Sequence, residues 1–258
     1  MPSANSSKHS PLVVTVAVMV VIVLVGALFT LLIGLGSNSK TKFTTVANSI
    51  GGGTPSPPTS SWSRPPDPVV PDGFTLFQDP AGRYEIALPS DWFVVDLSGP
   101  GGVDAAIDAA KQAHPDRAVS IGNVRANFVG TEVLLAVGPI KGALVNCLIV
   151  SSAGPLHGIT NSTFVASYGA QLRANIEPTD GPLAALQVTP TTINGQPALH
   201  TTFNYTAKLK SGATDQAYRY VALVEGNKSD FIVAMTTDSP DDFSNIFEQA
   251  ATTLTATS

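Results

Sequence analysis

The chain has 258 residues, of which 43% are hydrophobic and only 13% are charged, and its formal net charge is −5. The acidic balance argues against a nucleic-acid partner, because phosphate binding requires a basic face. The single cysteine excludes an internal disulfide framework and a cysteine-rich zinc site. The low charged fraction is typical of membrane-embedded sequence or of an unusually bland surface.

Residues 12–35 are an uncharged apolar segment that is long enough for a membrane-spanning helix. At roughly 1.5 Å per residue the helix would be about 36 Å long, which exceeds the ~30 Å hydrocarbon core. A cleaved signal peptide is the competing interpretation, but its apolar region would be only about 7–15 residues long. We therefore expect residues 12–35 to stay in membrane lipid, with residues 1–11 as a short cytoplasmic tail.

The positive charges on the two sides of this predicted helix are nearly equal in number, because lysines stand on both sides of it, so they decide its orientation only weakly. We favour a cytoplasmic amino terminus with the rest of the chain outside, since a short tail, one span and a large domain resemble an export signal. The alternative leaves the domain in the cytosol.

Residues 36–72 are predicted to be a linker, because 23 of these 37 positions are Pro, Gly, Ser or Thr. Such a composition buries too little apolar surface to offset the entropy of ordering the chain. The segment would hold a domain away from the bilayer, or it is an unremarkable connection.

Residues 73–258 are expected to form one globular domain, which holds 17 of the 19 acidic residues but only 10 of the 14 basic ones. Alternation and turn signals predict strands at 74–77, 84–88 and 92–97. Two helices are predicted to follow at 103–113 and 118–128.

The remaining part of the domain is predicted to be richer in strands. Asn161 is a candidate cap for a helix that runs to about Ile176, and Asn194-Gly195 is a hairpin signal. Ser239, Pro240 and Asp242 match the start of a last helix, with Ser239 as its cap. The strands are predicted at 132–137, 143–151, 186–193, 199–206, 218–224 and 231–237. Strands in runs, covered by helices, indicate an α+β fold with an antiparallel sheet.

Three stretches of the domain resemble the PsbP-like superfamily. The segment FQDPAGRYEIALPSDW at 77–92 is similar to the turn, Tyr-x-Ile-x-x-Pro-x-x-Trp element that opens that domain. NGQPA at 194–198 and the Phe243-x-x-Ile-Phe247 pattern resemble its ending. The resemblance implies a PsbP-like α/β/α sandwich at 73–258 and an accessory role, such as binding partners or stabilising complexes.

The resemblance is best to an anchored bacterial form, the actinobacterial lipoprotein-type branch. This sequence departs from that branch, since it has an apolar segment where those proteins carry a lipid-modified cysteine. Photosystem involvement is not implied by these residues.

A ligand-binding surface is the one site that the sequence suggests. Tyr218 and Tyr220 would share one face of a strand and Arg219 the other, and Tyr205 and Trp92 could join the aromatic patch. The competing interpretation places both tyrosines in the core, with their hydroxyl groups at its rim. No catalytic constellation, metal-ligand spacing or cofactor motif is recognised, so we predict no catalytic residue, metal or cofactor.

These observations favour a non-catalytic accessory or binding protein, anchored by one helix in the cell membrane with its domain outside. Its partner would be an unknown protein or another component of the cell envelope. A hydrolase or transferase with an unrecognised site is the alternative, and a purely structural spacer domain is the third possibility.

Overall fold

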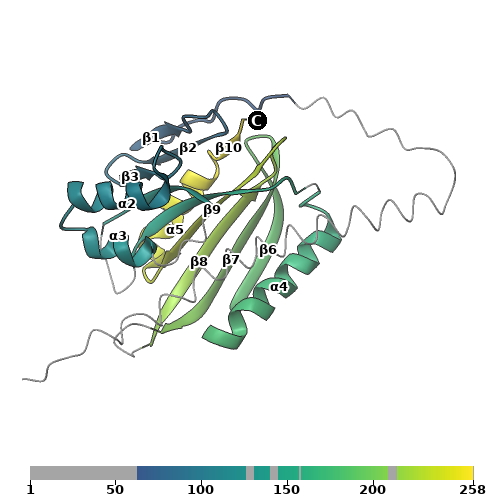
Figure 1. The fold of residues 1–258 in the computed structure, drawn as a ribbon. Helices are drawn as coiled ribbons and strands as arrows, with labels where there is room; N and C mark the ends of the chain where they lie inside the picture. Colours follow the sequence, from purple (N-terminus) through teal and green to yellow (C-terminus); the bar gives the residue numbers. More distant parts are fainter. Residues whose placement is uncertain (1–62, 126–130, 140–144, 157, 209–213, 258) are drawn as a thin grey trace, which may run out of the picture.

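The computed structural model describes residues 63–125, 131–139, 145–156, 158–208 and 214–257 (Figure 1). The predicted tail, the predicted membrane helix at 12–35 and most of the predicted linker lie outside the described residues. Within the described residues, no helix combines the length and the hydropathy that a membrane crossing requires.

The described chain contains the strands and helices that the sequence patterns predicted, in the predicted order, together with a short final strand. The strands are β1 (Phe74–Gln78), β2 (Tyr84–Pro89), β3 (Phe93–Asp96), β4 (Glu132–Val137), β5 (Cys147–Ala153), β6 (Ala184–Ile193), β7 (Gln196–Lys208), β8 (Thr214–Val224), β9 (Asp230–Thr237) and β10 (Thr255–Ala256). The helices are α2 (Gly102–Ala113), α3 (Ala118–Arg125), α4 (Ser162–Asp180) and α5 (Pro240–Ala251).

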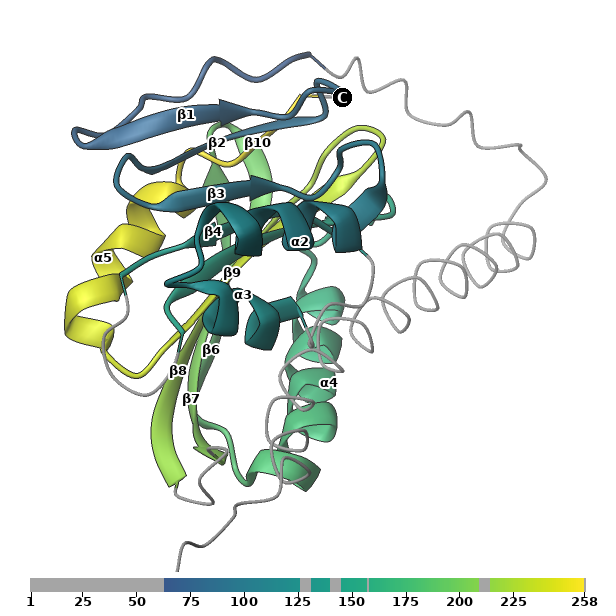
Figure 2. The ribbon, with the colours of Figure 1, turned by 60° about the vertical axis from the view of Figure 1, so that its left-hand side comes forward.

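The strands form two antiparallel sheets. The larger has seven strands in the order β3-β4-β5-β9-β8-β7-β6, and the smaller has three in the order β1-β2-β10. Helices α2, α3 and α4 lie over one face of the seven-stranded sheet, which we call the helical face (Figures 1 and 2). Helix α5 and the small sheet lie over the opposite face, which we call the α5 face. The predicted α+β fold with an antiparallel sheet is therefore confirmed.

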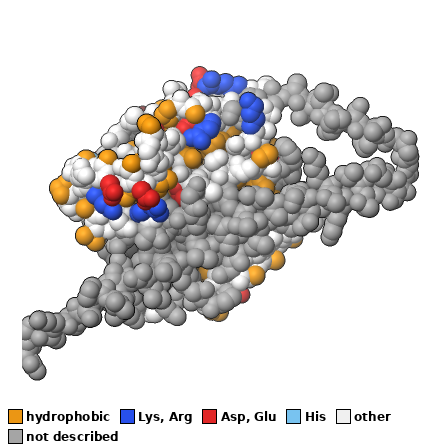
Figure 3. Space-filling model, in the orientation of Figure 1, with side chains coloured by type: hydrophobic (Ala, Val, Ile, Leu, Met, Phe, Trp, Pro, Cys, Tyr) orange, Lys and Arg blue, Asp and Glu red, His pale blue; other side chains and the backbone are white. Residues whose placement is uncertain are grey.

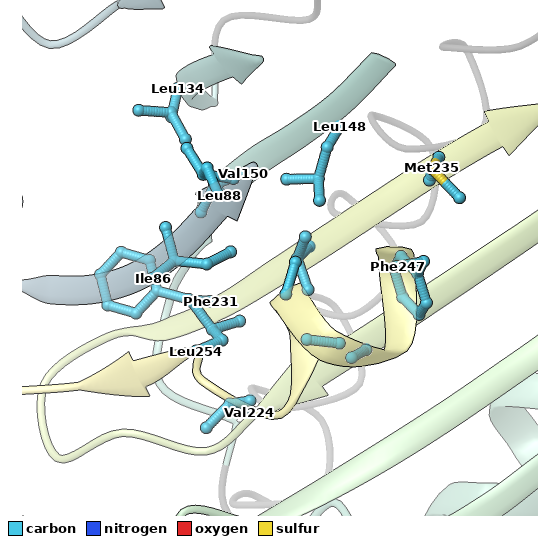
Figure 4. Close-up of a cluster of buried hydrophobic side chains, with 14 of the residues drawn as sticks. Ile86, Leu88, Leu134, Leu148, Val150, Val224, Phe231, Met235, Phe247 and Leu254 are labelled. Carbon is cyan, nitrogen blue, oxygen red and sulfur yellow. The ribbon is translucent and has the colours of Figure 1, made fainter. Parts of the chain in front are cut away.

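Alternation along the strands divides the apolar side chains between the two faces. On the α5 face, side chains from β2, β4, β5, β9 and α5 converge in one large cluster (Figure 4). The helical face carries two separate clusters. The α4 cluster includes Tyr168, Leu172, Phe203, Tyr205, Val221 and Leu223. The α2–α3 cluster includes Ile107, Ile121, Val124, Leu135, Val137 and Cys147.

Local sequence signals explain how the main elements begin and end. Asn194 and Gly195 have φ angles of 45° and 78°, so they form the predicted hairpin turn between β6 and β7. The side chain of Asn161 accepts a hydrogen bond from the Thr163 amide at 2.8 Å, as predicted for the start of α4. Helix α4 continues past the predicted end at Ile176 and stops only at Gly181.

The predicted capping role of Ser239 is wrong in one respect. Helix α5 begins at Pro240 with Ser239 in the cap position, but the Ser239 side chain makes no capping hydrogen bond. Its hydroxyl group instead donates to Asp238, 3.1 Å away. The acidic Asp241 and Asp242 remain in the first turn, where the helix dipole favours negative charge.

Residues 63–72, which belong to the predicted linker, lie against the domain. Arg64 forms an ion pair with Glu85 of β2 at 2.9 Å, and Pro68 is buried. The carbonyl oxygen of Pro66 accepts a hydrogen bond from Asn194, 2.6 Å away. The contacts of the domain therefore begin about ten residues before the predicted boundary at 73. The sequence did not reveal them, because composition alone does not report such contacts.

Candidate functional site

The centre of strand β8 carries the three adjacent residues that the sequence singled out. Tyr218, Arg219 and Tyr220 pair with Asn204, Phe203 and Thr202 on β7. Because successive side chains of a strand point to opposite faces, Tyr218 and Tyr220 lie on the α5 face and Arg219 on the helical face.

On the α5 face, Tyr220 packs against helix α5. Its ring centroid is 5.5 Å from that of Phe247, and its hydroxyl group faces Ser244. Burial raises the pKa of Tyr220, although the nearby Ser244 hydroxyl opposes this. Tyr218, two residues earlier, is half-buried beside this contact. Tyr220 is thus a partly buried member of the α5-face cluster.

Trp92 does not join a surface patch with these tyrosines. It is 6% exposed, and its ring lies 6.3 Å from Phe243 of α5. A Cβ atom on Gly138 would approach the Trp92 ring to 2.7 Å, so the indole packs directly over that backbone. The structure therefore places Trp92 in the core cluster on the α5 face.

Tyr205 belongs to the other face of the sheet. It pairs with Ala217 on β8 and lies in the α4 cluster, so it shares the helical face with Arg219. The predicted grouping of Tyr205 with Tyr218 and Tyr220 is wrong, because an odd number of positions separates it from them in the β7–β8 register. The structure instead brings Tyr205 and Arg219 together.

The guanidinium of Arg219 occupies a site between the two clusters of the helical face. Its electrostatic neighbours are Tyr168 and Tyr205 from the α4 cluster and Cys147 from the α2–α3 cluster. The side chain is buried, with 8% of the residue exposed, and its Nη1 atom donates a hydrogen bond to the Thr236 hydroxyl group on β9. The register of β8 and β9 places Arg219 directly opposite Thr236.

Within the described part of the chain, no carboxylate lies against this guanidinium. Burial lowers the pKa of Arg219, but an arginine stays protonated at any physiological pH. Burial raises the pKa of Cys147 to about 11 and that of Tyr168 to about 12, so neither side chain supplies a negative charge. Among the described residues, this site thus holds one buried positive charge without a counter-ion.

Polar groups beside Tyr168 are also incompletely bonded. Thr201 of β7 lies next to Tyr168, yet the two hydroxyl groups do not meet in a hydrogen bond of good geometry. The Thr201 hydroxyl oxygen and the Gln171 carbonyl oxygen are both buried without a hydrogen-bond partner among the described residues. Buried polar groups are normally hydrogen-bonded, so each such exception marks a site where a partner would stabilise the protein.

The two acidic residues of α2 have partners within the fold. Asp104 of α2 pairs with Arg125 of α3 at 2.6 Å, and Asp108 lies 3.5 Å from Lys111. Figure 3 shows acidic and basic side chains lying together over these helices. Among the described residues, no group of three or more His, Cys, Asp or Glu side chains is placed to hold a metal ion.

Sequence analysis missed Tyr168 and Thr236 as neighbours of Arg219. Tyr168 lies on the apolar stripe of α4 with Leu172 and Ile176, but no sequence pattern tells which strand such a stripe covers. One signal was available, since Arg219 interrupts an apolar row on its face of β8 formed by Ala217, Val221 and Leu223. A charged residue in such a row indicates either an exposed face or a site.

Comparisons with known proteins found no matching family model and no matching curated protein. Among solved structures, the chain is similar to the cyanobacterial PsbP of Synechocystis sp. PCC 6803. The TM-score is 0.43 and the identity 12%, over 81% of this chain and 99% of the other. A PsbP structure is thus among those to which this chain is similar, as the sequence resemblance predicted.

Two further solved structures are similar over most of their length. One is the Ran-binding protein Mog1p of Saccharomyces cerevisiae, with a TM-score of 0.41 and 10% identity over 71% of this chain and 95% of the other. The other is LpqN of Mycobacterium tuberculosis, which is involved in cell envelope biogenesis. It has a TM-score of 0.35 and 11% identity over 72% of this chain and 91% of the other. These identities are too low to transfer a function, so we rest the proposals below on residues of this chain.

Proposed function

We propose that this protein is a non-catalytic accessory or binding protein of the cell envelope, anchored by one membrane helix. Residues 12–35 would cross the membrane, with the amino terminus in the cytoplasm and the PsbP-like domain outside. The predicted linker would separate the domain from the bilayer and let it reach a protein or another envelope component.

One observation carries the binding role, namely the buried charge of Arg219. A buried ion without a counter-ion lowers the free energy of unfolding by an amount on the order of several kcal/mol. An apolar side chain of similar volume would avoid that cost. Folding therefore does not explain the presence of the charge, whereas the binding of a partner would explain it. Of the predicted ligand-binding residues, Tyr205 and Arg219 share the helical face, whereas Tyr218 and Tyr220 are half-buried on the opposite face.

The anchor is supported by the uncharged composition of residues 12–35. Protease added to intact cells should digest the domain, while a cytosolic control protein survives. The variant Leu24→Arg combined with Leu28→Arg should release the protein into the soluble fraction, because each central arginine costs about 2.5–3.5 kcal/mol of insertion free energy. A domain that is digested only after the cells are broken would reverse the proposed orientation.

The binding role can be tested in the same cells by placing a photo-crosslinking residue at Val165 of α4, which is partly buried and packs against the α4 cluster on the face that carries Arg219. The control position is Asn245 on α5, which is exposed and lies on the other side of the sheet. An adduct formed from position 165 but not from position 245 is expected. Equal adducts from both positions, or none from either, would contradict a specific binding surface on the helical face.

A further inference from the structure

We infer that Arg219 anchors the carboxylate group of an apolar ligand, held on the helical face between the α4 cluster and the α2–α3 cluster. This inference rests on the proposed binding role and names the class of ligand. It does not depend on the membrane anchor or on the orientation of the domain.

The need for an anion follows from the contacts of Arg219. Its guanidinium has five N–H donors, and one of its nitrogens donates to Thr236 in the described structure. No carboxylate of the described chain lies against it. A ligand anion would therefore supply the missing negative charge. Hydrogen bonds between charged groups are about twice as strong as those between neutral groups.

A carboxylate fits this site better than a phosphate monoester. The planar guanidinium forms two parallel hydrogen bonds with the two oxygens of a carboxylate. A carboxylate carries one negative charge and so balances one arginine. A phosphate monoester carries about −1.5 to −2 at neutral pH, which would leave excess negative charge buried beside Tyr168 and Cys147.

The apolar character of the ligand follows from the residues around the guanidinium. On β8 its same-face neighbours are Ala217 and Val221, and Phe203 stands directly across on β7. The α4 and α2–α3 clusters share no residue, yet both contribute neighbours of Arg219. A hydrocarbon or aromatic body attached to the carboxylate would therefore contact apolar side chains of both clusters.

The test uses the purified full chain, with hexanoate as the probe and hexanamide as its uncharged counterpart. Calorimetric titration should show hexanoate binding to the wild type, and binding to Arg219→Met should be roughly 10- to 100-fold weaker, as expected for lost charge-assisted hydrogen bonds. Arg219→Lys keeps the charge but loses the planar fork, so its affinity should be intermediate. Hexanamide and inorganic phosphate should each bind the wild type more weakly than hexanoate.

Thermal unfolding without ligand provides a second, independent measurement. If Arg219 is a ligand anchor, the midpoint for Arg219→Met should equal or exceed that of the wild type, because an uncompensated buried charge is removed. The matched control is Arg117→Met. Arg117 donates to the carbonyl oxygens of Val137 and Gly138, 3.1 and 3.4 Å away, so its loss should lower the midpoint.

Several outcomes would overturn the inference. One is a midpoint for Arg219→Met that falls as far as that of Arg117→Met, which would make Arg219 a structural residue. Equal binding of hexanoate by the wild type and Arg219→Met would show that the ligand binds elsewhere. If the wild type bound hexanamide as tightly as hexanoate, the negative charge of the ligand would not contribute to binding. If the wild type bound inorganic phosphate as tightly as hexanoate, the apolar body of the ligand would not contribute to binding. None of these results depends on protease accessibility, so the proposed membrane anchor is tested independently of this inference.

Discussion

At the scale of single residues, the core contains a tyrosine hydroxyl group that makes no hydrogen bond with the described chain. Tyr84 of β2 is fully buried on the α5 face, and its ring centroid lies 4.9 Å from that of Phe231. A buried hydroxyl group without a partner loses its hydration and gains nothing in exchange. The aromatic ring is therefore the stabilising part of this residue.

We expect Tyr84→Phe to raise the free energy of unfolding by about 1 kcal/mol, since it removes the unpaired hydroxyl group and keeps the ring. Urea denaturation followed by tryptophan fluorescence measures the change. The control is Tyr220→Phe, which loses a hydroxyl group that faces Ser244 and should destabilise by a similar amount. A lower stability for Tyr84→Phe would show that the hydroxyl group has a partner after all.

A second residue-scale feature is the buried carboxylate of Asp230 at the start of β9. Its two oxygens accept hydrogen bonds from the backbone amides of Leu156 and Gly226, at 2.7 and 2.9 Å. Burial raises the pKa of Asp230 from 3.8 to about 7, although these two hydrogen bonds act in the opposite direction. The negative charge of Glu225 adds to the increase.

The sign of the pH dependence follows from this upward shift. Because folding favours the protonated carboxyl group, the stabilising contribution of Asp230 is complete below pH 3.8 and is lost as the pH rises through about 7. The stability of the wild type relative to Asp230→Asn should therefore fall between pH 4 and 7, with a slope of up to about 1.4 kcal/mol per pH unit. Denaturation at several pH values measures the difference, and a constant gap would contradict the shifted pKa.

At the scale of elements, the turn between β8 and β9 depends on a glycine for close packing. A Cβ atom at Gly226 would lie 2.1 Å from the Ser229 carbonyl oxygen and 2.9 Å from Cβ of Ala256. Backbone on one side and the last strand on the other leave no space for a methyl group. We expect Gly226→Ala to destabilise the protein by about 3 kcal/mol, through forced movement of the backbone.

The matched control for this turn is Gly154→Ala, because a Cβ atom at Gly154 would meet nothing within 4 Å. Its urea midpoint should stay close to that of the wild type. If both variants unfold at the same midpoint, the β8–β9 turn has more room than the structure shows.

Periodicity and turn residues were enough to predict the strands and helices of the described domain. The alternation of β7 and the apolar stripe of α5 depend on neighbours only a few residues apart, so the sequence contains them directly. Strand β10 was missed, because two residues cannot show a period. It pairs with β2, which stands about 170 positions earlier in the chain.

The candidate site was only partly predictable for the same reason. Arg219 points to the opposite face of the sheet from Tyr218 and Tyr220. This arrangement is a local consequence of strand geometry and was predicted correctly. The proximity of Arg219 to Tyr168, Tyr205 and Cys147 requires the register of β7 and β8 and the position of α4. Pairing over such distances depends on the packing of the whole domain.

At the scale of the whole molecule, the carboxyl-terminal residues join the two sheets. Thr255 and Ala256 pair with β2 of the small sheet. The side-chain amide of Gln196, at the start of β7 in the large sheet, donates to the Ala256 carbonyl oxygen at 3.1 Å and accepts from the Ala256 amide at 2.9 Å. Asn194 adds a hydrogen bond to the Thr255 hydroxyl group at 2.8 Å. The last strand is thus bonded to both layers at once.

A chain that stops after Leu254 should therefore lose more stability than any single contact explains. Removing Thr255 and Ala256 leaves the side-chain oxygen of Gln196 and the edge of β2 without partners in the described structure, whereas the Gln196 side-chain nitrogen still donates to the Glu225 carbonyl oxygen at 3.2 Å. Each unsatisfied buried group costs about 1–3 kcal/mol. We expect a loss of roughly 4 kcal/mol or more by urea denaturation. The variant Gln196→Met, which keeps β10 and removes only the amide bonds, should lose about half as much. If the truncated chain unfolds at the same urea concentration as Gln196→Met, β10 contributes nothing beyond that amide, and the two layers are held together by their apolar contacts alone.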